Sequence, residues 1–201
     1  MSILSIRFLE ETRAYTGIEL RPHFLLTEIG LRGSAMAAFI GPCDVSTENL
    51  VDWEDRLAND YISAAKMLHF IGEFFGMSLR EGVFLQRLLM SMLTEMICGE
   101  VNKKPKLFCE VFRVGDDIFL RDGSASSTKE RKLSVSIVTA SPVSQLLHVG
   151  LNIDPTGAPV AAVGLDELGI PPDKLALSAL ERFSSELTSC DWACAKVRPV
   201  M

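Results

Sequence analysis

Apolar and polar residues alternate around short turns between residues 113 and 154, and this pattern predicts antiparallel strands. The predicted strands cover residues 107–114, 118–120, 131–140 and 146–153, and Gly115-Asp116-Asp117 forms the first turn. A strand holds charged side chains at fixed positions, so a ligand can meet them without first ordering a loop. We therefore expect the functional site of the protein to lie in this meander.

The amino-terminal part of the chain has a similar character. Residues 3–9 and 34–40 are predicted strands because apolar, β-compatible residues dominate both segments. Proline at position 22 cannot donate to a central ladder. We therefore expect Arg21 and His23 at the entrance of a strand that begins at Phe24.

Apolar residues recur every three or four positions in four other segments, which predicts amphipathic helices. Three of these helices lie in the middle of the chain, starting at Ser46, covering residues 64–75, and running from Ser78 to Gly99. The fourth covers residues 175–187, and residues 192–197 form a final predicted strand. Together the elements predict a single α+β domain over residues 1–201, in which a mainly antiparallel, twisted sheet is flanked by helices.

Composition restricts the class of protein. Of 201 residues, 48% are hydrophobic, which is enough for a packed core, and the formal net charge of −6 argues against broad nucleic-acid binding. The start of the chain does not resemble a secretory leader, and no apolar stretch is long enough to span a bilayer. Five scattered cysteines do not form a disulfide framework. We therefore expect a cytoplasmic protein that binds neither nucleic acid nor membrane, and that forms a homodimer through a sheet edge or the methionine-rich helix.

The meander carries the candidate chemistry. A fixed ammonium group at Lys132 can neutralise a phosphate or a developing oxyanion, and His148 can act as an acid or a base, so we expect both to be catalytic. The other candidates are polar residues expected to bind a small-molecule ligand: Arg21, His23, Asp116, Asp117, Ser134, Ser136 and Asn152. The alternative interpretation is an antiparallel sheet whose surface simply carries salt bridges.

No metal site is predicted. The acidic residues Glu48, Asp52, Glu54 and Asp55 could hold Mg²⁺, but such a group is more typical of a solvated helix face. Cys190 and Cys194 lack further ligands at a spacing that zinc requires.

The chain resembles an uncharacterised prokaryotic family catalogued as domain of unknown function 366, over nearly its whole length. The resemblance rests on several blocks: Gly41-Pro42-Cys43, Val51-Asp52-Trp53-Glu54-Asp55, Met67-Leu68-His69-Phe70-Ile71, Gln86-Arg87-Leu88-Leu89, Thr139-Ala140-Ser141-Pro142 and Lys196-Val197-Arg198-Pro199. Membership in this family implies no established activity.

Residues 113–154 also resemble the biotin and lipoate protein ligases, which have a fold like that of class II aminoacyl-tRNA synthetases. Asp116-Asp117-Ile118, Lys132-Leu133-Ser134 and the strand from His148 follow one another as in those ligases. The resemblance implies that Lys132 faces an acyl or acyl-adenylate group and that Asp117 lies near the nucleotide or metal. The chain departs from the ligases at Asp116 instead of asparagine and at Val135 instead of glycine, and it lacks a clear match to their adenylate loop.

Two functions follow from these observations. The first is a small-molecule or nucleotide-binding enzyme of acyl- or adenylyl-transfer, ligase-like type, with Lys132 as the electrostatic group. The cofactor is not identified, and ATP with Mg²⁺ is the candidate. The alternative is a non-catalytic ligand-binding or protein-interaction module on the same fold, in which Val135 closes the acyl channel.

Overall fold

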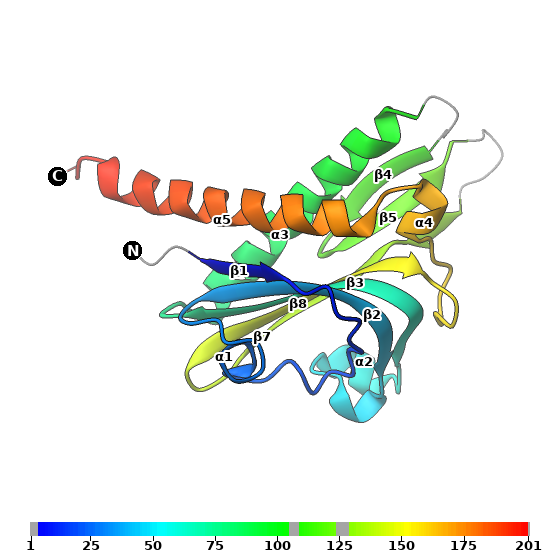
Figure 1. Ribbon diagram of the computed structural model, residues 1–201, viewed down its shortest axis with the longest axis horizontal. Helices are drawn as coiled ribbons and strands as arrows, with labels where there is room; N and C mark the ends of the chain where they lie inside the picture. Colours follow the sequence, from blue (N-terminus) through cyan, green and yellow to red (C-terminus); the bar gives the residue numbers. More distant parts are fainter. Residues whose placement is uncertain (1–3, 105–108, 124–128, 201) are drawn as a thin grey trace.

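Two β-sheets organise the protein (Figure 1). The computed structural model describes residues 4–104, 109–123 and 129–200. The main sheet has the strand order β1-β2-β3-β8-β7, and the small sheet has the order β4-β5-β6. The strands are β1 (Ser5–Phe8), β2 (Ala35–Val45), β3 (Ile62–Phe75), β4 (Cys109–Val114), β5 (Asp117–Asp122), β6 (Glu130–Lys132), β7 (Ser134–Ala140) and β8 (Ser144–Asp154). All paired neighbours are antiparallel except β1 and β2.

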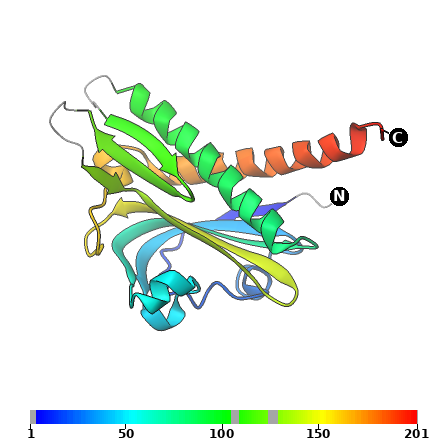
Figure 2. The same cartoon turned by 180° about the vertical axis from the view of Figure 1, so that it is seen from behind.

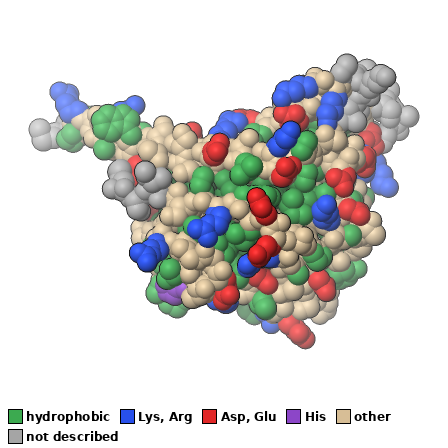
Figure 3. All heavy atoms as spheres, viewed as in Figure 1, with side chains coloured by type: hydrophobic (Ala, Val, Ile, Leu, Met, Phe, Trp, Pro, Cys, Tyr) green, Lys and Arg blue, Asp and Glu red, His purple; other side chains and the backbone are tan. Residues whose placement is uncertain are grey.

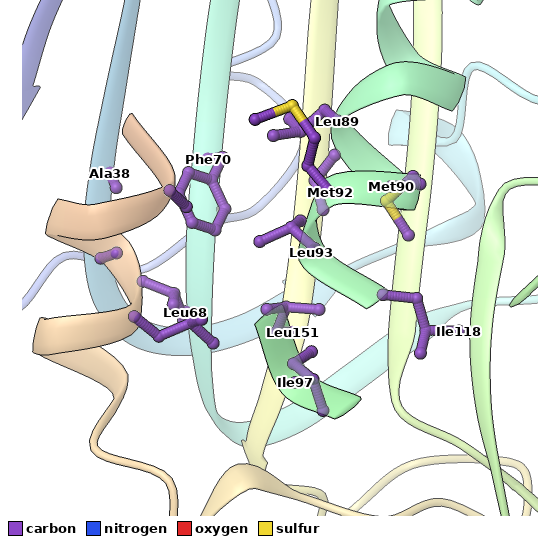
Figure 4. Close-up of a cluster of buried hydrophobic side chains, with 14 of the residues drawn as sticks. Ala38, Leu68, Phe70, Leu89, Met90, Met92, Leu93, Ile97, Ile118 and Leu151 are labelled. Carbon is purple, nitrogen blue, oxygen red and sulfur yellow. The ribbon is translucent and has the colours of Figure 1, made fainter. Parts of the chain in front are cut away.

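Two long helices, α3 (Leu79–Asn102) and α5 (Pro172–Lys196), lie against one face of the main sheet (Figures 1 and 2). Helix α3 begins with a capping box, in which Ser78 and Glu81 exchange side-chain and backbone hydrogen bonds. Between α3 and the sheet, Phe70 and Leu151 pack against Leu93 in a buried cluster (Figure 4). Burial of each such large side chain contributes about 1.5 to 3 kcal/mol, so this cluster anchors α3 to the two central strands.

The opposite face of the main sheet is covered by irregular chain and short helices. These helices are α1 (Phe24–Thr27), η1 (Thr47–Asn49) and α2 (Trp53–Leu57), while α4 (Leu165–Leu168) precedes α5. Tyr15, Phe24 and Leu25 form a second buried cluster with Phe39 of β2 and Met67 of β3. The central strands are therefore buried on both faces, and each face contributes to a separate layer of the core.

The prediction of a helix over residues 64–75 is wrong. This segment is the central strand β3, which pairs with β2 on one side and with β8 on the other. Because both of its faces are buried, nearly every residue is apolar, and the alternation typical of a half-exposed strand is absent. In a continuous apolar run, apolar residues also occur at every third or fourth position, so the run fits the helical period as well. The middle of the chain therefore holds one long helix instead of three.

Other predicted boundaries also differ. Residues 192–197 do not form a strand, because α5 continues to Lys196, and α3 passes Gly99 and ends at Asn102. The helix expected from Ser46 is replaced by the single turn of η1 and the five residues of α2. Arg21 and His23 precede helix α1 instead of a strand. Residues 107 and 108, which were predicted to begin a strand, lie outside the described residues.

The long strand predicted over residues 131–140 is divided between the two sheets. Lys132 ends β6 in the small sheet, Ser134 begins β7 in the main sheet, and Leu133 lies between them. Leu133 is fully buried, and its N–H donates to the carbonyl of Ile118 at 2.8 Å. The other strands of the predicted meander are present. Within the described residues, no helix is long and apolar enough to cross a membrane.

Candidate functional site

Lys132 is held by backbone bonds on two sides. Its N–H donates to the carbonyl of Ala161 at 2.8 Å, and its own carbonyl accepts from Val163 at 3.1 Å. The amide Nδ2 of Asn152 donates to the same carbonyl at 3.2 Å, which ties β6 to the end of β8. These bonds fix the direction of the Lys132 side chain without help from a ligand.

The Lys132 ammonium forms an ion pair with Asp117 at the start of β5. The Nζ–Oδ2 distance is 2.8 Å, and the two side chains are 30% and 23% exposed. Burial raises the pKa of the Asp117 carboxyl, and the hydrogen bond from Lys132 acts in the opposite direction. The pair is therefore largely sheltered from solvent, and both side chains keep some exposure.

A third charged group, from a distant part of the sequence, interacts electrostatically with this pair. Asp55 of α2 has a raised pKa because of burial and because of repulsion from Asp52 and Asp60, while Lys132 lowers it. Repulsion from Asp55 also contributes to the raised pKa of Asp117. The larger repulsion of Asp117 comes from Asp116, so both Asp116 and Asp55 contribute negative charge around the Lys132–Asp117 pair. In the described part of the chain, no three His, Cys, Asp or Glu side chains are grouped to hold a metal ion.

His148 lies on β8, in the core, and is not part of the Lys132–Asp117 ion pair. Its Nε2 is 3.1 Å from Nδ1 of His69 on β3. The ring of Tyr15 stacks on it with a centroid distance of 3.7 Å and an interplanar angle of 8°. Burial and, to a lesser extent, the neighbouring His69 hold the pKa of His148 well below 6.5. The catalytic role expected for His148 remains a prediction, and this structure gives His148 a packing environment.

Asp116 and Ser136 contact helix α3. The amide Nε2 of Gln86 donates to the Asp116 carboxylate at 3.0 Å and to the Ser136 hydroxyl at 2.7 Å. Arg87 adds an ion pair with Asp116 at 3.4 Å. The hydroxyl of Ser134, which is fully buried, accepts from the N–H of Ile118 at 2.7 Å.

The two serines and Asn152 lie on different faces of the main sheet. Ser134 stands opposite Leu151 in the β7–β8 register. Successive residues of a strand alternate between faces, so Asn152 and His148 point away from the side of α3. The structure therefore places Ser134 and Ser136 on the face opposite to Asn152 and His148, while Ser136 stays in contact with Asp116 through its hydrogen bond to the Asp116 carbonyl at 2.8 Å.

Arg21 and His23 lie at the opposite end of the main sheet. Arg21 pairs with Glu28 at 2.9 Å, and the N–H of His23 donates to the buried carboxylate of Glu73 at 2.9 Å. The Ser144 hydroxyl donates to the same carboxylate at 2.7 Å. Ser144 is eight residues before Asn152 on β8, or roughly 26 Å along the strand. Arg21 and His23 are thus not part of the arrangement around Lys132.

Two groups near the site were not selected from the sequence. Asp55 belongs to an acidic segment interpreted as a solvated helix face, and only the fold brings it to Lys132. The sequence shows Val135 where the ligases have glycine, but the contacts of Val135 follow only from the fold. A Cβ atom built at Gly150 would lie 3.1 Å from Cγ2 of Val135 and 3.1 Å from Cε of Met67. These two side chains therefore occupy the space over Gly150, on the face that carries Asn152.

A family model matches nearly the whole chain and assigns it to a family. It belongs to the family described as "Domain of unknown function (DUF366)", which matches residues 4–198. An uncharacterized protein of Methanocaldococcus jannaschii is 26% identical over 98% of this chain and 86% of its own length.

Solved structures extend this assignment. A protein of unknown function from Pyrococcus horikoshii is 33% identical, covers 98% of this chain and all of its own, and superposes with a TM-score of 0.86. A biotin protein ligase from Aquifex aeolicus, in complex with biotin and ATP, is 16% identical over 92% of this chain and 70% of its own, with a TM-score of 0.51. The expected α+β, ligase-like fold and the expected family are thereby confirmed.

Proposed function

We propose that the protein is a small-molecule- or nucleotide-binding enzyme of acyl- or adenylyl-transfer type. The observation that carries this proposal is the ion pair between Lys132 and Asp117, at 2.8 Å and with both side chains partly exposed. A carboxylate or phosphate of a ligand can replace Asp117 as the partner of Lys132. The ammonium group then stabilises negative charge on the acyl or phosphoryl oxygen.

The fold supports the same assignment. The biotin protein ligase of similar fold binds biotin and ATP, which are a carboxylic acid and a nucleotide. At 16% identity this likeness concerns the fold alone. The chemistry of the proposal therefore rests on the charged groups of this chain.

The residues around Lys132 fit a nucleotide that carries Mg²⁺. Asp117 supplies a carboxyl group beside the ammonium group, and Asp55 is near enough to interact electrostatically with both. Mg²⁺ is commonly held by one or two carboxylates together with the phosphates of its substrate. Lys132 would contact a phosphate or acyl oxygen, and the two aspartates would hold the metal that arrives with the nucleotide.

A thermal-shift screen tests the proposal. The panel contains ATP, other nucleotides, biotin, lipoate and octanoate, each with and without Mg²⁺, and the proteins are the wild type and Lys132→Ala. A ligand at a hundredfold excess over its Kd stabilises the folded state by about 2.7 kcal/mol. We expect a shift for the wild type that is lost in Lys132→Ala, followed by ATP–pyrophosphate exchange that requires Lys132.

Lys174→Ala is the matched control, because Lys174 is exposed near the start of α5. This variant should keep every shift of the wild type. A shift that persists in Lys132→Ala would place the ligand elsewhere. The absence of any shift across the panel would contradict the enzyme assignment.

One observation favours a second candidate, a non-catalytic ligand-binding or protein-interaction module. Val135 and Met67 fill the space over Gly150, on the face where an acyl group near Lys132 would extend. A module of this kind would bind no acyl compound. None of the compounds in the panel would then change the melting temperature of the protein, and Lys132 would remain paired with Asp117.

A further inference from the structure

Helix α5 ends in an arm, defined as residues 189–196, that stands clear of the rest of the molecule (Figures 1 and 3). Every residue of the arm is exposed. The arm is about two helical turns, or roughly 12 Å, long. It carries Trp192, whose side chain is 64% exposed. Large aromatic residues are depleted from free surfaces and enriched in interfaces, so an aromatic side chain on a free-standing arm calls for a partner.

A hollow of about 660 Å³ lies beside the arm. We name it the arm groove. It is lined mainly by apolar residues from the end of β3, the start of α3 and the inner side of α5, among them Phe74, Met77, Phe84, Leu85, Leu187 and Cys190. Phe84 is itself 63% exposed. The groove is thus an apolar surface of a size that a helix side can fill.

The arm and the groove share one element. Leu187, Cys190 and Cys194 lie three and four residues apart, so they form one stripe on the groove side of α5. Trp192 is two residues from both Cys190 and Cys194, so it lies on the other side of α5 and does not line the groove of its own chain. In the groove of a second copy, with the stripe against that copy's α5, Trp192 would face the opposite wall at Phe84 and Leu85. A second arm laid antiparallel along this stripe would bring its own stripe to the first copy. This reciprocity is the signature of a twofold interface, in which each copy gives and receives the same contact.

Charge favours the same arrangement. Glu81 and Asp191 lie at the groove, whereas Lys196 ends the arm and Arg198 follows it. No ion pair is formed by Lys196 or Arg198 within the described residues. In an antiparallel pair, the basic end of one arm approaches the acidic groove of the other copy, which selects this orientation over a parallel one.

We propose that the arm groove is the docking site for the α5 arm of a second copy of this chain. The two arms exchange across a twofold axis, and the apolar stripe of each α5 is covered by the other. This interface differs from the sheet edge suggested by the sequence, and it includes only the start of α3, the methionine-rich helix of the other suggestion. It is independent of the function proposed for Lys132.

Light scattering coupled to size-exclusion chromatography tests the proposal with the full chain under reducing conditions. We expect a mass of twice the 22.1 kDa of one chain, and a mass of one chain for Trp192→Ala. The matched control is Trp53→Ala, because Trp53 is similarly exposed, at 69%, on the distant helix α2. This control should remain dimeric. A monomeric wild type, or a dimer that persists in Trp192→Ala, would overturn the proposal.

Disulfide cross-linking tests the orientation of the arms. Diamide takes up the two electrons and two protons that two thiols release when they form a disulfide. We expect it to join two copies through Cys190 and Cys194, which are both exposed on the arm. Circular dichroism should show that the double variant Cys190→Ser, Cys194→Ser folds normally, and this variant should form no cross-link. A wild-type dimer that is not cross-linked, or a cross-link that survives in the double variant, would contradict the antiparallel arrangement.

Discussion

Nδ1 of His69 lies 3.1 Å from Nε2 of His148, in a buried layer beneath the ring of Tyr15. The carbonyl of Gly41, 3.3 Å from Nε2 of His69, can only accept a hydrogen bond. It therefore fixes the proton of neutral His69 on Nε2 and leaves Nδ1 as an acceptor. His148 donates to that acceptor through Nε2. A proton added to His69 would oppose two N–H groups, so this pair is stable only when both rings are neutral.

The free energy of unfolding should consequently fall as the pH is lowered from about 6.5 toward 4. Burial lowers the pKa of His69 to about 4 and that of His148 well below 6.5, so the unfolded chain takes up these protons at higher pH than the folded one. The contribution of the neutral rings is complete above the unfolded pKa and is lost as the pH falls toward the folded pKa. For His69 alone the loss is about 3 kcal/mol.

Urea denaturation at several pH values between 7 and 4 measures this dependence. His69→Gln should have a smaller slope of stability against pH than the wild type. His23→Gln is the control, because His23 is exposed and lies outside the buried histidine pair, with its ring stacked on Phe75 and its N–H bonded to Glu73. An unchanged slope in His69→Gln would show that other groups cause the acid sensitivity.

Breaking the Lys132–Asp117 pair should destabilise the fold. Lys132→Met leaves the Asp117 carboxyl without its partner, so we expect a loss of about 1 to 2 kcal/mol, between the values for exposed and buried pairs. It should also raise the pKa of Asp117 further, because the hydrogen bond that opposes burial is removed.

A double-mutant cycle with Asp117→Asn isolates the interaction. The double variant should lose less stability than the sum of the single variants. Lys103→Met, which breaks the exposed pair with Glu100, should change stability by less than about 0.5 kcal/mol. Strict additivity in the Lys132 cycle would mean that the two groups do not interact in solution.

Ser134 offers a test that separates a structural from a ligand-binding role. Ser134→Ala removes the acceptor for the buried N–H of Ile118, and an unpaired buried donor costs about 1 to 3 kcal/mol. We expect a lower melting temperature but an unchanged ligand-induced shift, since the serine faces the α3 side of the sheet. If the shift disappears in Ser134→Ala while circular dichroism is normal, Ser134 contacts the ligand.

Shortening Val135 should open the space over Gly150. The Val135→Gly variant removes the methyl groups that now pack there, at a cost of about 1 to 2 kcal/mol in stability. We expect carboxylic acids such as octanoate or lipoate to bind this variant more tightly than the wild type, as measured by calorimetry. Val138→Gly, on the other face of the same strand, is the control and should show no gain. Equal affinities in the wild type and Val135→Gly would mean that Val135 does not restrict the site.

Much of the fold is contained in local pattern, and the exceptions have a common cause. The partly exposed strands β4, β5 and β7 and helix α3 were predictable because each has one apolar side. Strand β8 is buried along nearly its whole length, and the turn at Ser141-Pro142 is what marked its start. Strand β3 was not predictable, because burial on both faces erases the period that distinguishes strands from helices. The end of α5 is predicted as a strand because residues 189–196 are all exposed, so no buried apolar side marks the helical period there.

The same limit applies to the candidate site. Lys132 and Asp117 could be associated from sequence because a single hairpin joins them. His69 and His148 are 79 residues apart, and their contact depends on β3 being a strand beside β8. Asp55 approaches Lys132 only through the placement of α2. Contacts between elements that are distant along the chain follow from topology, which the local pattern does not encode.

The passage of the chain through Leu133 couples two parts of the molecule mechanically. Lys132 belongs to the small sheet and Ser134 to the main sheet, so a single residue, Leu133, connects the two sheets along the chain. Any tilt of β4–β6 relative to the main sheet changes the distance from Lys132 to whatever lies over β8. The angle between the two sheets therefore sets the position of the Lys132 ammonium group. A substitution far along β4–β6 can change that position without contacting the site.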